Sequence, residues 1–207
     1  MKFEHMETVN AIVSGTYLPR MFRARQVFPR PALEVVRIPE ILRGELENGG
    51  VAERIKPGMS IAITAGSRMI ANSVTILRGI VRFVRDQGAP PFLIPAMGSH
   101  GGATAEGQKD MLATLGITEE TVGCPIRSSM ETVCIGKNDE GVDSYMDRYA
   151  YEADGIIIFN RIKPHSGFRG KYESGLIKMM AVGLGKQYGA EVLHSGGDET
   201  LAKNIYL

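Results

Sequence analysis

The sequence has no tryptophan and few other aromatic residues, and this shortage argues against one class of function. Aromatic residues make up 7% of the 207 positions, which leaves little material for stacking nucleic-acid bases. An excess of one charge is also missing, since 24 Lys and Arg oppose 23 Asp and Glu for a net charge of +1. We therefore expect no nucleic-acid partner and no electrostatic attraction to an acidic membrane.

Cysteine and long hydrophobic runs are equally scarce. Cys124 and Cys134 are the two cysteines, and their spacing fits neither a disulfide framework nor a zinc site. We expect both to be small, buried hydrophobic residues. No apolar run approaches the roughly 18 residues of a membrane-spanning helix, and no secretory signal segment is apparent. These absences predict a soluble, cytoplasmic protein without a membrane partner.

Short apolar runs alternate with amphipathic segments, and this alternation predicts the fold class. Helices are expected over 39–48, 71–88, 104–116 and within 172–182 and 186–194. Strands are expected over 32–38, 59–66, 90–98 and 155–162, with short strands or a hairpin at 132–136 and 143–151. The run 155–162 is almost wholly apolar, so we place it centrally. The order predicts an α/β fold with a mostly parallel twisted sheet and helices on both faces, a Rossmann-like three-layer arrangement.

The domain organisation follows from the same pattern. With 43% hydrophobic residues, the chain can form one sizeable core. We expect residues 1–207 to form a single α/β domain in which 1–30 is an extended arm with at most one short strand.

The first loop that follows a predicted strand carries Ser67 and Arg68 just before a helix. Ligands of open parallel sheets bind beyond the carboxyl ends of the strands. A hydroxyl and a guanidinium near a helix start are suited to a phosphate or carboxylate. A helix cap with a surface arginine is the simpler alternative.

The second such loop carries His100 among glycines. Gly98, Gly101 and Gly102 let the backbone approach a ligand closely, and a histidine there can transfer protons near neutral pH. The lysine that a P-loop requires is missing. A histidine that only caps a turn is the alternative.

The third loop-rich segment, 162–194, carries Lys163, His165, Lys171, Lys178 and His194. Three of the four histidines thus follow predicted strands of one sheet, and we regard His5, in the arm, as structural or incidental. Three histidines could bind a transition metal, or two could act as acid and base on either side of a substrate carbon. A lysine between them could hold a cofactor covalently. The spacing alone leaves these alternatives open.

The ordered set "GSHGG", then "IKPH", "SGLIK", "AVGLG" and a final histidine, resembles the N-terminal domain of the nickel-dependent lactate racemase family. That family has a strand-end G-x-H, then H-x-x-x-G-x-S-G-G-x-K, and a histidine 16 residues after the lysine. Ser174 to Lys178 resembles the S-G-G-x-K run, and His194 follows Lys178 by the same 16 residues. The resemblance extends from about Ile61 to His194.

The resemblance implies a nickel-pincer nucleotide as cofactor, attached covalently to Lys178 through a thioamide. It implies that His194 completes the nickel coordination and that His100 and His165 are the paired acid and base. Further cofactor contacts would come from Ser67, Arg68, Gly98, Ser174 and Gly175, with Arg68 on the phosphate.

The implied activity is that of an isomerase, a racemase or epimerase of 2-hydroxy acids. One histidine would remove the hydroxyl proton while hydride leaves the 2-carbon, and hydride would return to either face of the planar 2-oxo acid. The implied partners are a small 2-hydroxy acid and the proteins that make the cofactor, and nothing in the sequence excludes an oligomer. The family continues into a second domain that closes over the site, so we expect this chain alone to have an open site and little or no activity.

Three departures from the family pattern lie where the substrate would bind. The run from His165 to Lys178 is three residues longer than in the racemases, D-x-T-R-P is replaced by "AGSRMI", and Gly101 stands where the family has arginine. We therefore expect a 2-hydroxy acid other than lactate, such as a larger sugar acid or an aryl acid.

Lys171 is the alternative attachment point for the cofactor. The alternatives are a catalytically inactive domain that binds a nucleotide or phosphate, and a simple three-histidine metal site.

Overall fold

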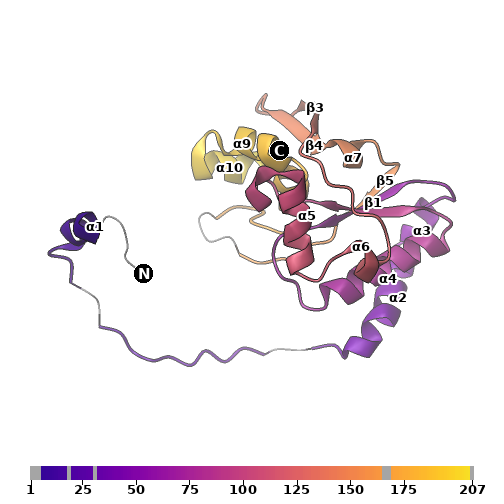
Figure 1. The fold of residues 1–207 in the computed structure, drawn as a ribbon, viewed down its shortest axis with the longest axis horizontal. Helices are drawn as coiled ribbons and strands as arrows, with labels where there is room; N and C mark the ends of the chain where they lie inside the picture. Colours follow the sequence, from indigo (N-terminus) through magenta and orange to yellow (C-terminus); the bar gives the residue numbers. More distant parts are fainter. Residues whose placement is uncertain (1–5, 18–19, 30–31, 165–168, 206–207) are drawn as a thin grey trace. The chain divides into compact units, whose positions relative to one another are not determined.

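The structure is a computed structural model that describes residues 6–17, 20–29, 32–164 and 169–205. The chain divides into two units, Met1–Ala32 and Leu33–Leu207 (Figure 1). In the first unit, helix α1 (Met6–Val13) precedes a stretch without regular structure, and no strand occurs among its described residues. The sequence predicted an extended arm with at most one short strand over 1–30, and α1 departs from that expectation, with Val9, Ile12 and Val13 at helical spacing.

The helices of the second unit largely follow the predicted pattern. In chain order they are η1 (Val35–Arg37), α2 (Ile38–Asn48), α3 (Val51–Arg54), α4 (Ser73–Asp86), η2 (Gly101–Ala103), α5 (Ala105–Thr114), α6 (Glu119–Val122), α7 (Arg148–Tyr151), α8 (Leu176–Lys178), the π-helical η3 (Met179–Gly183), α9 (Lys186–His194) and α10 (Gly197–Asn204). Thr104 caps the start of α5, because its side chain accepts a hydrogen bond from the backbone N–H of Gly107.

The strand predicted over 32–38 is wrong. This segment forms the turn η1 and the start of α2, with Pro39 in the first helical turn. Val35 and Val36 favour a strand locally, but no neighbouring strand pairs with them, and both side chains stay exposed. Strand propensity depends on packing against a neighbouring strand, and here the helix start at Pro39 prevails.

The strands form two sheets within the described part of the chain. β1 (Ile61–Ala65), β2 (Pro91–Pro95) and β5 (Gly155–Ile157) make a parallel sheet in the order β2-β1-β5. β3 (Thr132–Lys137) and β4 (Asp143–Asp147) form the expected antiparallel hairpin, although the second strand ends early because 148–151 is α7. The predicted α/β fold with a parallel sheet flanked by helices is confirmed.

The central position predicted for 155–162 is wrong, because β1 is the middle strand and β5 lies beside it at the edge. β5 is also shorter than predicted. Beyond Ile157 a side chain of β1 replaces the backbone as hydrogen-bond partner. The Thr64 hydroxyl accepts a hydrogen bond from Phe159 N at 3.0 Å. The apolar run is only partly buried, since β5 is half-covered and Ile162 at the end of the run is exposed.

The core lies on both faces of the parallel sheet. On one face Ile61, Ile63 and Leu93 pack with the apolar stripe of α4, in which Leu77 and Val84 are fully buried. On the other face Ala62, Phe92 and Ile94 pack against residues of α7 and η3. Every residue of β1 and β2 is buried, so the two strands and the loops that leave them have a rigid base.

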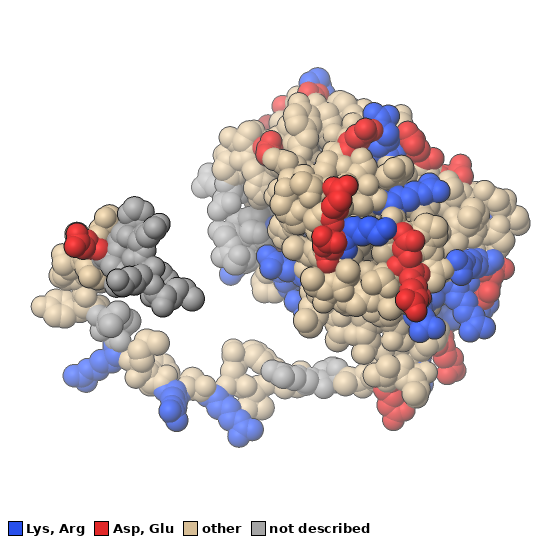
Figure 2. Space-filling model, viewed as in Figure 1, with Lys and Arg blue, Asp and Glu red and all other residues tan. Residues whose placement is uncertain are grey.

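The surface carries both charges. Figure 2 shows acidic and basic side chains interspersed over one face of the second unit, and several form ion pairs, such as Arg43 with Asp86 and Lys109 with Glu119. Across the described residues, no helix combines the length and apolar character needed to cross a bilayer.

The expectation that both cysteines are buried holds for Cys124 alone. Burial raises the pKa of the Cys124 thiol to about 11. Cys134 is exposed because it lies in β3, whose hairpin is only partly covered.

Replacing Thr64 by valine tests the side-chain bridge to Phe159. Thr64→Val keeps the buried volume but removes the acceptor of the Phe159 N–H, so we expect the free energy of unfolding to fall by about 1–3 kcal/mol in urea titrations. Thr114→Val, at an exposed helix position, is the matched control and should change it by less than about 0.5 kcal/mol. Equal effects of the two substitutions would contradict the bridge.

Candidate functional site

The loops that leave the carboxyl ends of β1, β2 and β5 meet at a cleft of about 520 Å³, where helices α8 to α9 close the other side. Eight of the nine residues predicted for the site line this cleft, and they are Ser67, Arg68, Gly98, His100, Ser174, Gly175, Lys178 and His194. The ninth, His165, lies outside the described residues. The volume is in the usual range for a pocket that binds a small molecule or cofactor.

His100 contacts Ser67 where the loops after β1 and β2 approach each other. The Ser67 hydroxyl lies 2.5 Å from His100 Nδ1, although the two residues come from different loops. The sequence suggested that Ser67 contacts a cofactor, but it did not reveal this contact with the histidine. A hydrogen bond at Nδ1 determines which way the imidazole faces and leaves Nε2 for chemistry.

The environment of His100 favours a neutral imidazole. The ring stays accessible from the cleft, but partial burial lowers its pKa below the ordinary 6.5, and the positive charges of Arg68 and Lys178 lower it further. A neutral histidine at neutral pH can accept a proton.

The backbone of the His100 loop requires glycine at position 101. Gly101 has φ of +68°, and an added Cβ would come within 2.6 Å of Gly107 in α5. An arginine could not replace it without moving the loop away from the helix. The departure from the family pattern at this position is therefore built into the packing of the loop.

His194, at the end of α9, has a defined tautomer. Its Nδ1 lies 2.5 Å from the carbonyl oxygen of Ala190, and because a carbonyl only accepts, Nδ1 must donate. In the neutral ring, Nε2 then carries the lone pair. Histidines that bind metals commonly donate their other ring nitrogen to a backbone carbonyl in this way.

Lys178, the half-buried last residue of α8, lines the cleft, whereas Lys171 is not among the described lining residues. The turn before it is held to the loop after β5. Asn160 donates a side-chain hydrogen bond to Gly175 O at 2.9 Å, and Ser174 Oγ accepts from Lys163 N at 2.8 Å. Our sequence analysis missed Asn160 because it placed 155–162 in a strand, although a polar residue that ends an apolar run was a usable signal.

The cleft is rich in positive charge. Its described lining includes the cations Arg68, Arg161, Lys163 and Lys178, against the single carboxylate Glu191. This balance suits an anionic ligand such as a phosphate or carboxylate.

The described residues do not form a metal site by themselves. No three His, Cys, Asp or Glu side chains of this part of the chain lie close enough to hold a metal ion together. A metal next to His194 would need donors beyond these residues.

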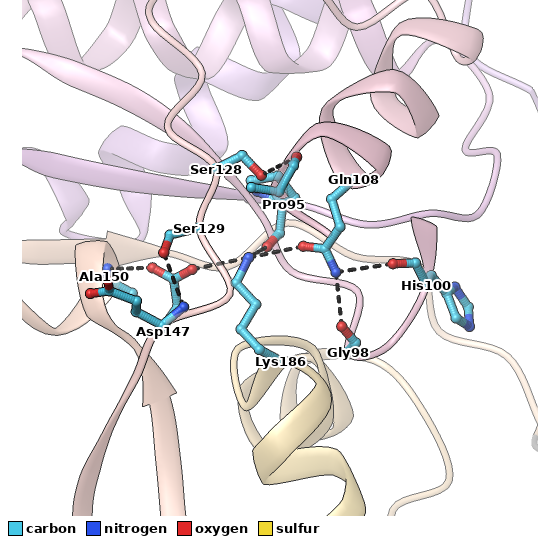
Figure 3. Close-up of polar contacts among 11 residues, drawn as sticks. Pro95, Gly98, His100, Gln108, Ser128, Ser129, Asp147, Ala150 and Lys186 are labelled. Atoms are coloured by element: carbon cyan, nitrogen blue, oxygen red, sulfur yellow. Dashed lines mark hydrogen bonds and ion pairs between the residues drawn. The ribbon is translucent and has the colours of Figure 1, made fainter. Parts of the chain in front are cut away.

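Two buried residues behind the cleft also escaped our sequence analysis. Gln108 and Lys186 are fully buried and contact each other, and Gln108 also contacts the loop that carries His100 (Figure 3). A glutamine on a helix and a lysine after a glycine turn have no distinctive spacing, so the sequence contained no signal for them.

Comparison with known proteins agrees with this geometry. The family model described as the lactate racemase N-terminal domain matches residues 10–194. No curated protein matches the chain. The matched segment spans most of the chain and contains the lining residues of the cleft. The chain therefore belongs to the lactate racemase N-terminal domain family.

Proposed function

We propose that this chain provides the cofactor-holding half of a racemase or epimerase that acts on a 2-hydroxy acid. One observation carries the proposal: Arg68, His100, Lys178 and His194, from four separate segments, line one cleft beyond the carboxyl ends of parallel strands. The family match supports a racemase-related activity in general.

The cleft fits a nickel-pincer nucleotide in three respects. Its cationic lining suits a phosphate, Lys178 can attach the cofactor covalently, and His194 offers Nε2 to a metal whose remaining donors belong to the cofactor. When bound, such a cofactor would supply a reversible hydride acceptor for the 2-carbon of the substrate. A covalent attachment would hold the acceptor rigidly against the substrate, as hydride transfer requires.

His100 would act as one of the two bases. To take the hydroxyl proton at Nε2, the ring must carry its own proton on Nδ1 and donate it to Ser67 Oγ. The lowered pKa keeps this base neutral at neutral pH. By resemblance, His165 would serve the opposite face of the substrate.

The substrate would be larger than lactate. Ser174 and Gly175, which belong to the segment that is longer than in the racemases, contribute to the wall of the cleft. A change in the length of that wall alters the space beside Lys178. A sugar acid or an aryl acid is the class that we propose.

Replacing Lys178 tests the attachment. After co-expression with cofactor-making enzymes, intact-mass measurement should find an adduct on the wild-type protein and none on Lys178→Arg, since a guanidinium cannot form the thioamide but keeps the positive charge.

Lys171→Arg is the matched control and should keep the adduct. Loss of the adduct in Lys171→Arg with retention in Lys178→Arg would reverse the assignment. An adduct on Lys178 without isotope exchange at the 2-carbon of any 2-hydroxy acid would favour the inactive binding domain.

The charge of Arg68 provides a test of the His100 environment. NMR titration of the cofactor-free protein should give His100 a pKa below 6.5, and Arg68→Gln should raise it because a repelling charge is removed. In the loaded enzyme the base must be neutral, so kcat/KM should fall as pH drops through this pKa. Arg54→Gln, exposed on α3, is the control and should leave the titration unchanged. A His100 pKa at or above 6.5 in the wild-type protein would contradict this account.

A further inference from the structure

The ammonium group of Lys186 lies in the interior of the second unit, with no solvent exposure. Its Nζ donates hydrogen bonds to Pro95 O at 2.6 Å and Gln108 Oε1 at 3.0 Å, and it forms an ion pair with the acceptor Asp147 Oδ2 at 3.0 Å. These acceptors come from the end of β2, from α5 and from the end of β4. Lys186 itself has a left-handed backbone with φ of +54°, a conformation that a lysine adopts only where the surrounding contacts require it.

Lys186 and Asp147 are both buried, and their opposite charges compensate each other. Asp147 Oδ1 accepts from Ala150 N, while Oδ2 has no hydrogen-bond partner among the described residues and depends on the ion pair with Lys186. Burial lowers the pKa of Lys186, and the charge of Asp147 opposes that effect. The pair therefore keeps an ammonium in place behind the cleft.

The ammonium determines how the Gln108 amide is oriented. Lysine can only donate, so the Gln108 oxygen must face Lys186 and its NH₂ group must point the other way. There the NH₂ group donates to Gly98 O at 2.8 Å and to His100 O at 3.2 Å (Figure 3). One buried side chain thus binds two carbonyl oxygens of the turn that carries His100.

Apart from the contact of Ser67 with His100 and the packing of Gly101 on α5, the described contacts of this turn are mainly backbone hydrogen bonds. Glycine makes up much of the stretch 98–102, and its backbone hydrogen bonds, such as His100 N to Met97 O at 3.2 Å, are mostly long. A glycine-rich turn loses much conformational entropy when it is ordered, so a fixed donor pair beneath it has a large effect on its position.

We infer that Gln108, oriented by the Lys186–Asp147 pair, is a positioning residue that holds the His100 turn against the cleft. The inference deepens the proposed function, because a catalytic consequence follows only if His100 is a base. The claim that Gln108 holds the His100 turn does not depend on the cofactor and can be tested in the cofactor-free protein.

Gln108→Glu separates the contact with Lys186 from the contacts with the carbonyl oxygens of the turn. The carboxylate keeps the side-chain length and still pairs with Lys186, but it has no donor for the two carbonyl oxygens. We expect amide hydrogen exchange at Gly98, His100 and Ala103 to accelerate by about 10-fold or more, while the amides of β1 keep their rates. Gln87→Glu, the same change near the end of α4, is the control and should leave the turn unchanged.

A measurement on the wild-type protein covers the case in which the variant fails to fold. The Gln108 side-chain NH₂ protons should exchange slowly and show NOEs to the His100 turn. Substitution of Lys186 is less informative, because it would leave Asp147 buried without a cation and destabilise the whole unit.

In the cofactor-loaded enzyme, Gln108→Glu should lower kcat by about 10- to 100-fold and change KM by less than about 3-fold, since a displaced base affects the chemical step more than binding. Fast exchange of the Gln108 NH₂ protons in the folded wild-type protein, or unchanged turn amides in folded Gln108→Glu, would overturn the inference. Neither result would bear on attachment at Lys178, so failure of this inference is distinguishable from failure of the proposed function.

Discussion

The buried ammonium of Lys186 is the interaction on which the arrangement of the site depends. It joins the end of β2, helix α5 and the end of β4, and it is also the first residue of α9. Helix α9 ends at His194, and α5 supports the turn of His100. The elements that carry the two described histidines are therefore tied to one buried charge, which is costly to bury and hence costly to displace.

The cleft is formed on one side by loops that leave the buried strands β1 and β2, and on the other by the segment before Lys178. β1 and β2 are buried at every residue, so the loops that leave them start from fixed points. The opposite wall comes from the segment around Ser174 and Gly175, whose hydrogen bonds run to the loop after β5. The departures from the family pattern lie in both walls, because "AGSRMI" and Gly101 follow β1 and β2 whereas the longer run before Lys178 lies opposite.

Local patterns predicted local structure well and long-range structure less well. The helices predicted over 71–88 and 104–116 are confirmed as α4 and α5. The same kind of evidence failed at 32–38, where valines without a partner strand form a turn, and at 155–162, where an apolar run lies at an edge. Strand pairing is decided by residues far away in the sequence, which periodicity does not contain.

The sequence by itself determined the α/β class, the strand-end positions of the candidate residues and the ordered motifs of the family, because each depends on neighbours along the chain. Only the tertiary structure decided that the Ser67 hydroxyl contacts His100 and that Gln108 and Lys186 support the site from behind. These contacts join segments up to 91 residues apart, as between Lys186 and Pro95. Hydrogen-bond geometry at that separation exists only once the core has packed.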